Sequence, residues 1–116
     1  MKTIVNDIET RVEFKNFIEE HKKQLIIVKA SATWCGPCKR IKNDFLTMFN
    51  NMPDNVILIE LDIDESDDVA QYLKIRKVPT IMNFVNGLPM DIYTTSDVTQ
   101  IKQFFDKCNV HLSMGF

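Results

Sequence analysis

The chain has 116 residues, of which 45% are hydrophobic and 26% are charged. This length fits one folded domain, and the composition is that of a globular protein rather than a disordered or fibrous one. The formal net charge is -2, and the lysines and arginines are scattered, so the chain lacks the basic surface that nucleic-acid-binding proteins use. We expect a single domain spanning residues 1–116 that does not bind nucleic acid.

The N-terminal residues do not resemble a targeting signal. Residues 1–7 carry one lysine, but no apolar run of signal-peptide length follows them, and no stretch approaches the ~18 apolar residues of a membrane span. Three cysteines are an odd number for a framework of structural disulfides. We therefore expect a cytoplasmic protein without a membrane partner, in which a close cysteine pair is catalytic or metal-binding.

The apolar pattern of the first half predicts alternating strands and helices. Residues 3–8 fit a short edge strand, and residues 10–22 have the apolar spacing of an amphipathic helix. The continuous apolar run at residues 25–28 indicates a strand that is covered on both faces. An apolar stripe over residues 41–49 predicts a second helix. A parallel or mixed sheet with helices on both sides is implied.

The second half continues the alternation and contains a hairpin. Asn86-Gly87 is the strongest short hairpin signal in the sequence, and Pro89 beside it fits an edge strand better than a central one. The predicted elements are a strand at 56–61, a helix at 69–73, strands at 80–85 and 90–93, and a helix from residue 98 to residue 108.

The sequence WCGPCK occupies residues 34–39, at the start of the predicted second helix. Extending the apolar stripe of that helix backwards reaches Cys38, so Cys38 should face inward, while Cys35 should lie at the exposed tip. A helix N-terminus presents unpaired backbone N–H groups and about half a positive charge, which stabilise a thiolate at Cys35. Pro37 is compatible with this position because the N–H that it lacks would be unpaired there.

Two thiols at this spacing can exchange disulfide bonds. Cys35 would attack a substrate disulfide, and Cys38 would then attack the mixed disulfide, release the reduced substrate and leave Cys35 joined to Cys38. Zinc sites also use such a pair, but a zinc ion needs two further ligands. The remaining candidates, Cys108, His21 and His111, form no second pair at ligand spacing, so we expect no metal.

Residues 34–39 match the WCGPCK signature of thioredoxins, and Val78-Pro79-Thr80 resembles the cis-proline loop of that family. The likeness extends over nearly the whole chain. It implies an α/β thioredoxin fold, in which a central mixed sheet of about five strands is flanked by four helices. It also implies a nucleophilic Cys35, a resolving Cys38, supporting roles for Gly36 and Pro37, and a cis peptide bond before Pro79.

The same resemblance implies a substrate groove and a reaction. The groove would be formed by Trp34, Val78, Pro79, Thr94 and Thr95, and an extended substrate segment would pair with the backbone beside Pro79. Gly-Pro between the cysteines is the reducing dipeptide of the family, so we expect a protein-disulfide reductase acting on disulfide-containing proteins. It would need a thioredoxin-reductase-like or other dithiol donor, bind no cofactor and be a monomer. The alternative is a thioredoxin-fold module that docks a partner with little or no redox turnover.

Two residues depart from the family pattern. Lys29 stands where thioredoxins usually carry a buried aspartate that helps to deprotonate the resolving thiol, and Glu60 stands where the family often has a lysine. We hypothesise that the pair is kept with reversed polarity, because a lone buried charge is costly. Lys29 could then be the base for Cys38 or, as a cation, favour the Cys38 thiolate. Alternatively, Lys29 extends its ammonium group to solvent.

Cys108 lies on the apolar stripe of the last predicted helix. We expect a buried, inert thiol there, and the alternative is a redox-sensing or dimerising cysteine. His21 and His111 have no motif around them and are expected at the surface.

Overall fold

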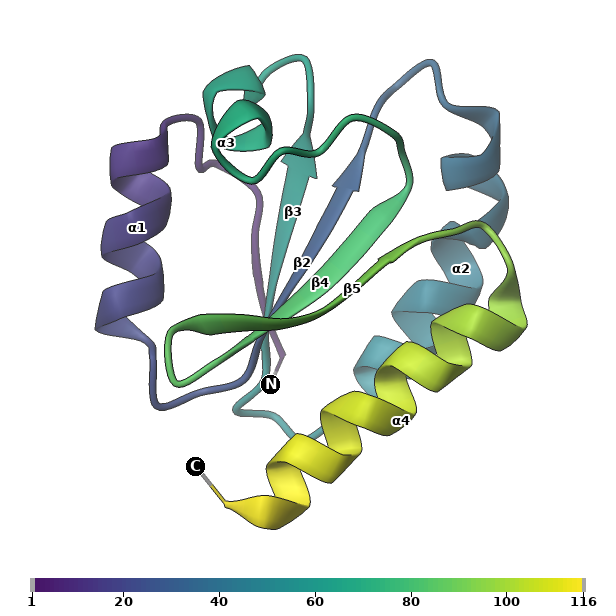
Figure 1. Cartoon of the computed structure of the whole chain (residues 1–116). Coiled ribbons are helices and arrows are strands. Elements are labelled where there is room, and N and C mark those ends of the chain that lie inside the picture. The colour runs from purple at the N-terminus through teal and green to yellow at the C-terminus, as the bar shows by residue number, and fades with distance from the viewer. Residues whose placement is uncertain (1, 116) are drawn as a thin grey trace.

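The computed structural model describes residues 2–115 and is built around a mixed β-sheet (Figure 1). Its five strands are β1 (Thr3–Val5), β2 (Ile26–Ser31), β3 (Ile57–Asp62), β4 (Thr80–Val85) and β5 (Leu88–Thr94). They lie in the order β1-β3-β2-β4-β5. β1 and β2 run parallel to β3, whereas β4 is antiparallel to both β2 and β5. The sheet confirms the expected α/β class.

Four helices cover the two faces of this sheet. They are α1 (Arg11–Glu20), α2 (Gly36–Asn50), α3 (Asp67–Tyr72) and α4 (Val98–Met114). In Figure 1, α1 and α3 lie on one side of the sheet, and α2 and α4 lie on the other. None of the helices within residues 2–115 is long and apolar enough to cross a membrane.

The central strands supply apolar side chains alternately to the two faces, and two separate cores result. On one face, Ile27 and Leu58 belong to the core that includes Phe45 of α2 and Phe104 of α4. On the other face, Ile26 and its neighbours pack with α1 and α3; that core contains Phe14, Ile18, Val28, Ile59, Val69 and Met82. Burial on both faces explains the continuous apolar runs of β2 and β3 in the sequence.

Local signals in the sequence begin and connect several elements. Thr10 caps α1, because its hydroxyl accepts a hydrogen bond from the Glu13 N–H at 3.2 Å while the Glu13 carboxylate accepts one from the Thr10 N–H at 3.1 Å. Asn86 and Gly87 have positive φ values of 54° and 80°, as a tight two-residue hairpin turn requires. The predicted hairpin is therefore confirmed.

Two elements run beyond their predicted ends. β2 continues to Ser31, since Lys29 pairs with Glu60 on β3 and with Ile81 on β4, so the ladder holds these polar positions in the strand. α4 continues past residue 108 to Met114, because Leu112 still packs against the core of that face. Hydrogen bonding and packing with distant segments extend both elements.

Candidate active site

The dithiol lies where β2 passes through a short loop into α2. Cys35 is the N-cap residue of α2, and Cys38 lies in its first turn. Their sulfur atoms form a disulfide, and their Cα atoms are 5.3 Å apart. The backbone N–H of Cys38 points at the Cys35 sulfur, with 3.1 Å between the nitrogen and the sulfur. A helix N-terminus therefore donates directly to Cys35, as an anionic sulfur there would require.

Both cysteines are buried, which corrects the expectation that Cys35 lies at an exposed tip. The exposed fraction is 3% for Cys35 and 4% for Cys38, whereas Trp34 is 65% exposed. Cys35 is covered because Val78 and Ile63, from two other loops, pack on the small cluster that holds the disulfide. The exposed tip is therefore Trp34.

A second loop approaches the disulfide just before β4. The Val78–Pro79 peptide bond is cis, as the resemblance implied, and the Val78 carbonyl oxygen lies 3.8 Å from the Cys35 sulfur. Thr95 comes from a third loop, and its N–H donates to the Pro79 carbonyl oxygen at 3.2 Å. Thr94 and Thr80 share a hydrogen bond between their hydroxyl groups at 2.9 Å. Of the five residues predicted for the groove, Val78 thus approaches Cys35, Thr95 is bonded to Pro79, and Thr94 is the last residue of β5.

Trp34 has a partner that the sequence did not reveal. Its indole N–H donates to the Asp64 carboxylate at 2.9 Å. Asp64 is oriented in turn, because its own N–H donates to Asp62 Oδ1 at 2.8 Å. Asp64 lies thirty positions from Trp34 in the sequence, just after β3. Only the chain path around the sheet brings Asp64 to the active site.

Lys29 and the second cysteine, Cys38, line the same small cavity. Its side chain is only 4% exposed, so it does not extend its ammonium group into bulk solvent as one alternative supposed. The Lys29 ammonium nitrogen lies 5.1 Å from the centre of the Phe45 ring, and Lys29 is directly beside Glu60 in the ladder between β2 and β3. Burial lowers the pKa of Lys29 from its usual value; the negative charge of Glu60 opposes this effect and the positive charge of Lys42 adds to it.

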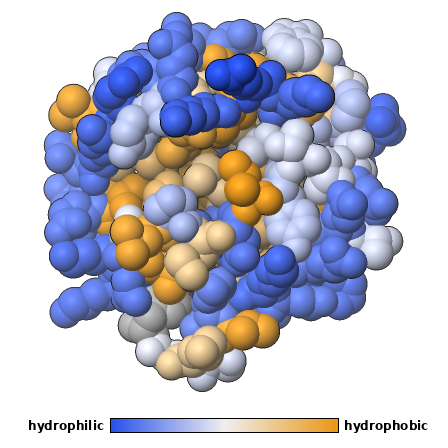
Figure 2. All heavy atoms as spheres, in the orientation of Figure 1, coloured by the Kyte–Doolittle hydropathy of each residue, from blue (hydrophilic) through white to orange (hydrophobic). Residues whose placement is uncertain are grey.

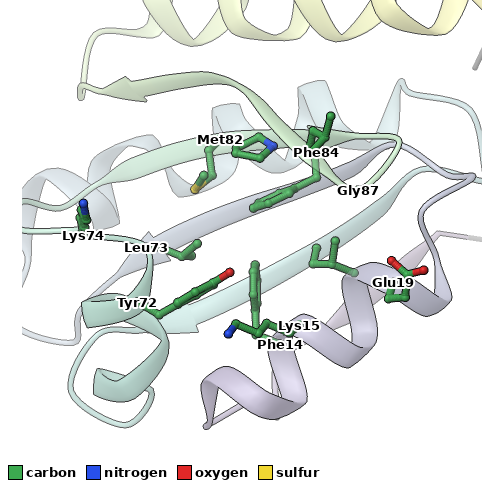
Figure 3. A pocket seen from close by; sticks show the side chains of 12 residues that line it. Phe14, Lys15, Glu19, Tyr72, Leu73, Lys74, Met82, Phe84 and Gly87 are labelled. Atoms are coloured by element: carbon green, nitrogen blue, oxygen red, sulfur yellow. The ribbon is translucent and has the colours of Figure 1, made fainter.

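The structure also has a larger hollow far from the dithiol. This cavity of about 470 Å³ lies between α1, α3 and the hairpin of β4 and β5. Figure 3 shows Phe14, Tyr72 and Phe84 around it, and the Phe14 and Phe84 ring centres are 5.6 Å apart. Apolar side chains also gather at the middle of the face that Figure 2 shows, and Leu88, Met90 and Ile92 of β5 are exposed. The cavity contains none of the predicted site residues.

A polar cluster lies under α4. Asn83 is fully buried and donates to the Asp91 carboxylate at 2.9 Å and to the Cys108 sulfur at 3.4 Å. His111 Nε2 lies 2.9 Å from the same Asp91 oxygen. We had expected His111 to be a surface residue, but its side chain is half-buried and paired with Asp91. Burial raises the pKa of Cys108 to about 12, although the hydrogen bond from Asn83 opposes the effect.

Within residues 2–115, no three His, Cys, Asp or Glu side chains come close enough together to hold a metal ion.

Comparison with known proteins agrees with this geometry. The thioredoxin family model matches residues 5–107. The chain is 34% identical to a thioredoxin of Ophiophagus hannah over 107 residues, which is 92% of this chain and 98% of the relative. It is 37% identical to a Homo sapiens thioredoxin over 84 residues, covering 72% of this chain and 79% of the relative.

Solved structures also resemble this one. A thioredoxin of Malassezia sympodialis superposes with a TM-score of 0.77 at 28% identity, covering 92% of this chain and 94% of the other. A reduced thioredoxin pre-protein of Schistosoma mansoni shares the fold with a TM-score of 0.80 at 24% identity, covering 91% and 98%. With a family match over most of its length and a cysteine pair joined at the start of α2, this chain belongs to the thioredoxin family of thiol–disulfide oxidoreductases.

Proposed function

We propose that this protein reduces disulfide bonds in other proteins, with Cys35 as the attacking thiol and Cys38 as the resolving thiol. The observation that carries this assignment is the hydrogen bond from the Cys38 N–H to the Cys35 sulfur at the N-terminus of α2. That N–H and the helix dipole favour a negative charge on Cys35 rather than on a sulfur further along the helix.

The reaction proceeds in two exchanges that balance. In the first, the Cys35 thiolate attacks one sulfur of a substrate disulfide, and the other substrate sulfur leaves as a thiolate and takes up a proton. In the second, the Cys38 thiolate attacks the Cys35 sulfur, the Cys35–Cys38 disulfide forms, and the second substrate sulfur leaves as a thiolate. Over the two exchanges the substrate gains two electrons and the protein dithiol loses two. The short distance between the Cα atoms of Cys35 and Cys38, 5.3 Å, suits this ring closure.

The substrate segment lies across the groove formed by Trp34, Val78, Pro79, Thr94 and Thr95. The exposed Trp34 supplies an apolar wall, and its hydrogen bond to Asp64 fixes the indole ring beside the disulfide. The backbone of Val78 lies against Cys35, where an extended segment of a partner could pair with it. Gly36 and Pro37 begin α2, and the nearest atom to the side of Gly36 is the end of the Arg40 side chain, 3.9 Å from where a Cβ would lie.

The remaining features of the proposal follow from the family and the sequence. Residues 1–116 act as one domain and as a monomer in the cytoplasm. The protein binds no cofactor, and an external dithiol donor of the thioredoxin-reductase type or another dithiol returns Cys35 and Cys38 to the reduced state.

An insulin-reduction assay tests the function. With dithiothreitol as the donor, the protein should accelerate precipitation of the insulin B chain, a Cys35→Ser variant should not, and a Cys38→Ser variant should accumulate a mixed disulfide with insulin. No acceleration over dithiothreitol alone would overturn the proposal and favour a binding module without redox turnover.

A further inference from the structure

A buried lysine shares a cavity with the resolving thiol. The cavity has a volume of about 210 Å³ and is lined by Lys29 and Cys38, together with the surrounding residues Ser31, Ala32, Thr33, Lys39, Lys42, Glu60 and Asp62. Lys29 comes from β2, in the middle of the sheet, so its side chain starts from the protein interior. Cys35, the attacking thiol, does not line this cavity.

The charges around the cavity come from three elements. α2 contributes Lys39 and Lys42, both exposed, and β3 contributes Glu60 and Asp62, which are partly exposed. β4 places the apolar Ile81 beside Lys29 in the ladder. Of these charged groups Lys29 alone is buried, and charges in a buried environment are screened less by solvent than charges on a rim. Lys29 is therefore the charge in this cavity that solvent screens least.

We propose that the Lys29 ammonium group stabilises the thiolate of Cys38 in the reduced protein and thereby speeds the resolving step. This inference depends on the proposed function, because it concerns the second exchange of that reaction. Cys38 loses its proton to water in the cavity, and its thiolate attacks the Cys35 sulfur of the mixed disulfide. The bond between Cys35 and the substrate breaks, and the substrate thiolate leaves and takes up a proton from solvent. Lys29 keeps its proton and acts as a positioning charge.

The cationic role suits this cavity better than the role of a base. To act as a base, Lys29 would have to lose its proton before each cycle. The neighbouring carboxylate of Glu60 instead favours the charged amine. The amine also lies over the ring of Phe45, which favours a cation. Burial lowers the pKa of Lys29, and the carboxylate and the aromatic face both oppose that effect by favouring the ammonium form of a side chain that lines the cavity with the thiol.

The first test is a titration of Cys38 in a Cys35→Ser background. Thiolate absorbance is recorded against pH with Lys29 present and in a Lys29→Met variant. Cys108 does not interfere, because its pKa of about 12 lies above the range that is scanned. Loss of the buried cation should raise the titration midpoint of Cys38 by about one pH unit, which corresponds to a tenfold loss of thiolate at neutral pH.

The second test measures the resolving step itself. Reduced protein with both cysteines is mixed with Ellman's reagent in a stopped-flow instrument, and thionitrobenzoate is released first by Cys35 and then by Cys38. Because a less acidic thiol is also more nucleophilic, the tenfold loss of thiolate should slow the second phase by only about three- to fourfold near neutral pH. At alkaline pH, where Cys38 is ionised in both proteins, the Lys29→Met variant should be as fast or faster.

The crossing of the two pH profiles separates an electrostatic role from damage to the structure, which would slow the reaction at every pH. Lys42→Met is the matched control: it removes the same charge from the same cavity, but the side chain is exposed, so its effect should be much smaller. Lys29→Arg keeps the charge and should retain the low midpoint. Lys29→Gln removes the charge but keeps a polar side chain, so it should raise the midpoint in the same way if Lys29→Met does not fold.

An unchanged midpoint of Cys38 in Lys29→Met, or equal slowing at all pH values, would overturn this inference. These outcomes differ from a failure of the proposed function, in which the wild-type protein would release no thionitrobenzoate in a second phase and would not accelerate insulin reduction.

Discussion

Cys35 and Cys108 are both almost completely buried, yet the structure gives their sulfur atoms opposite surroundings. Cys35 caps a helix and accepts the N–H of Cys38, in a small cluster with Ala32 that Ile63 and Val78 pack against. Cys108 lies in the middle of α4, within the apolar core, where burial raises its pKa to about 12. The exposed fraction alone therefore does not indicate which thiol reacts. The position relative to a helix end, and the access to backbone donors, decide it.

The two thiols should differ most in their rates of alkylation. With a pKa of about 12, on the order of one Cys108 in ten thousand is ionised near pH 8. Iodoacetamide labelling of the reduced native protein, followed by peptide mass spectrometry, should modify Cys35 at least a hundredfold faster than Cys108. Rapid modification of Cys108 in the native protein would contradict this and would revive a redox-sensing or dimerising role for it.

Substitutions at the two thiols should separate activity from structure. Cys35→Ser should lower insulin reduction to the background set by dithiothreitol, since the first exchange needs this sulfur. Cys108→Ala should retain activity within about twofold, because it removes only a core sulfur and costs on the order of 1 kcal/mol of stability. A comparable loss of activity in the correctly folded Cys108→Ala variant would show that the two regions are coupled.

The polar cluster beside Cys108 should matter for stability and not for redox chemistry. The pairing of β4 and β5 shifts register between Met82 and Phe84, and the Asn83 side chain compensates by accepting the Asp91 N–H at 2.9 Å. Asn83→Ala would leave that buried donor without its partner, so we expect a loss of about 2–3 kcal/mol in urea unfolding.

Asn109→Ala is the matched control for this substitution. The same side chain is removed there from the exposed face of α4, where alanine favours a helix, so the stability should change by less than about 0.7 kcal/mol. Equal effects at the two positions would mean that the cluster contributes no more than any surface amide.

The smallest expected effect is an acid dependence at Asp91. Burial alone would raise the pKa of Asp91, but the hydrogen bonds from Asn83 and His111 and the positive charges of His111 and Lys107 outweigh it, so the pKa lies below the usual 3.8. A carboxyl with a lowered folded-state pKa stabilises the protein above about pH 4, and this contribution is lost as the pH falls through the folded-state value.

Urea unfolding between about pH 5 and pH 2 should therefore show a steeper loss of stability for the wild-type protein than for Asp91→Asn. Parallel curves would mean that the ionisation of Asp91 is not linked to folding. Reductase activity at neutral pH should be the same in both proteins, because Asp91 lies under α4 and not at the N-terminus of α2.

Much of the active site could be predicted because its signals are local. One continuous segment contains the two cysteines, the proline between them and the apolar stripe of α2. Helical periodicity relates these features directly. The hairpin of Asn86 and Gly87 was equally readable, since its turn demands positive φ at two consecutive residues.

Other parts of the site could not be predicted because their partners are distant in sequence. Nothing local to Trp34 points to Asp64, and nothing local to Cys35 indicates that Val78 and Ile63 cover it. His111 was misplaced at the surface for the same reason, since its partner Asp91 lies on another element. In each case the sheet order brings the two segments together, and that order is not encoded in a short pattern.

The amino-acid sequence by itself determined the order of helices and strands, a sheet that is either parallel or mixed, and the pair of thiols at the start of a helix, because periodicity and spacing act over a few residues. Only the tertiary structure decided which charges reach the buried sulfur of Cys38 and how deeply Cys35 lies. The reason is physical: burial and electrostatic potential depend on every segment that packs around a group, and the segments around these thiols come from β2, β3, α2 and the loop before β4.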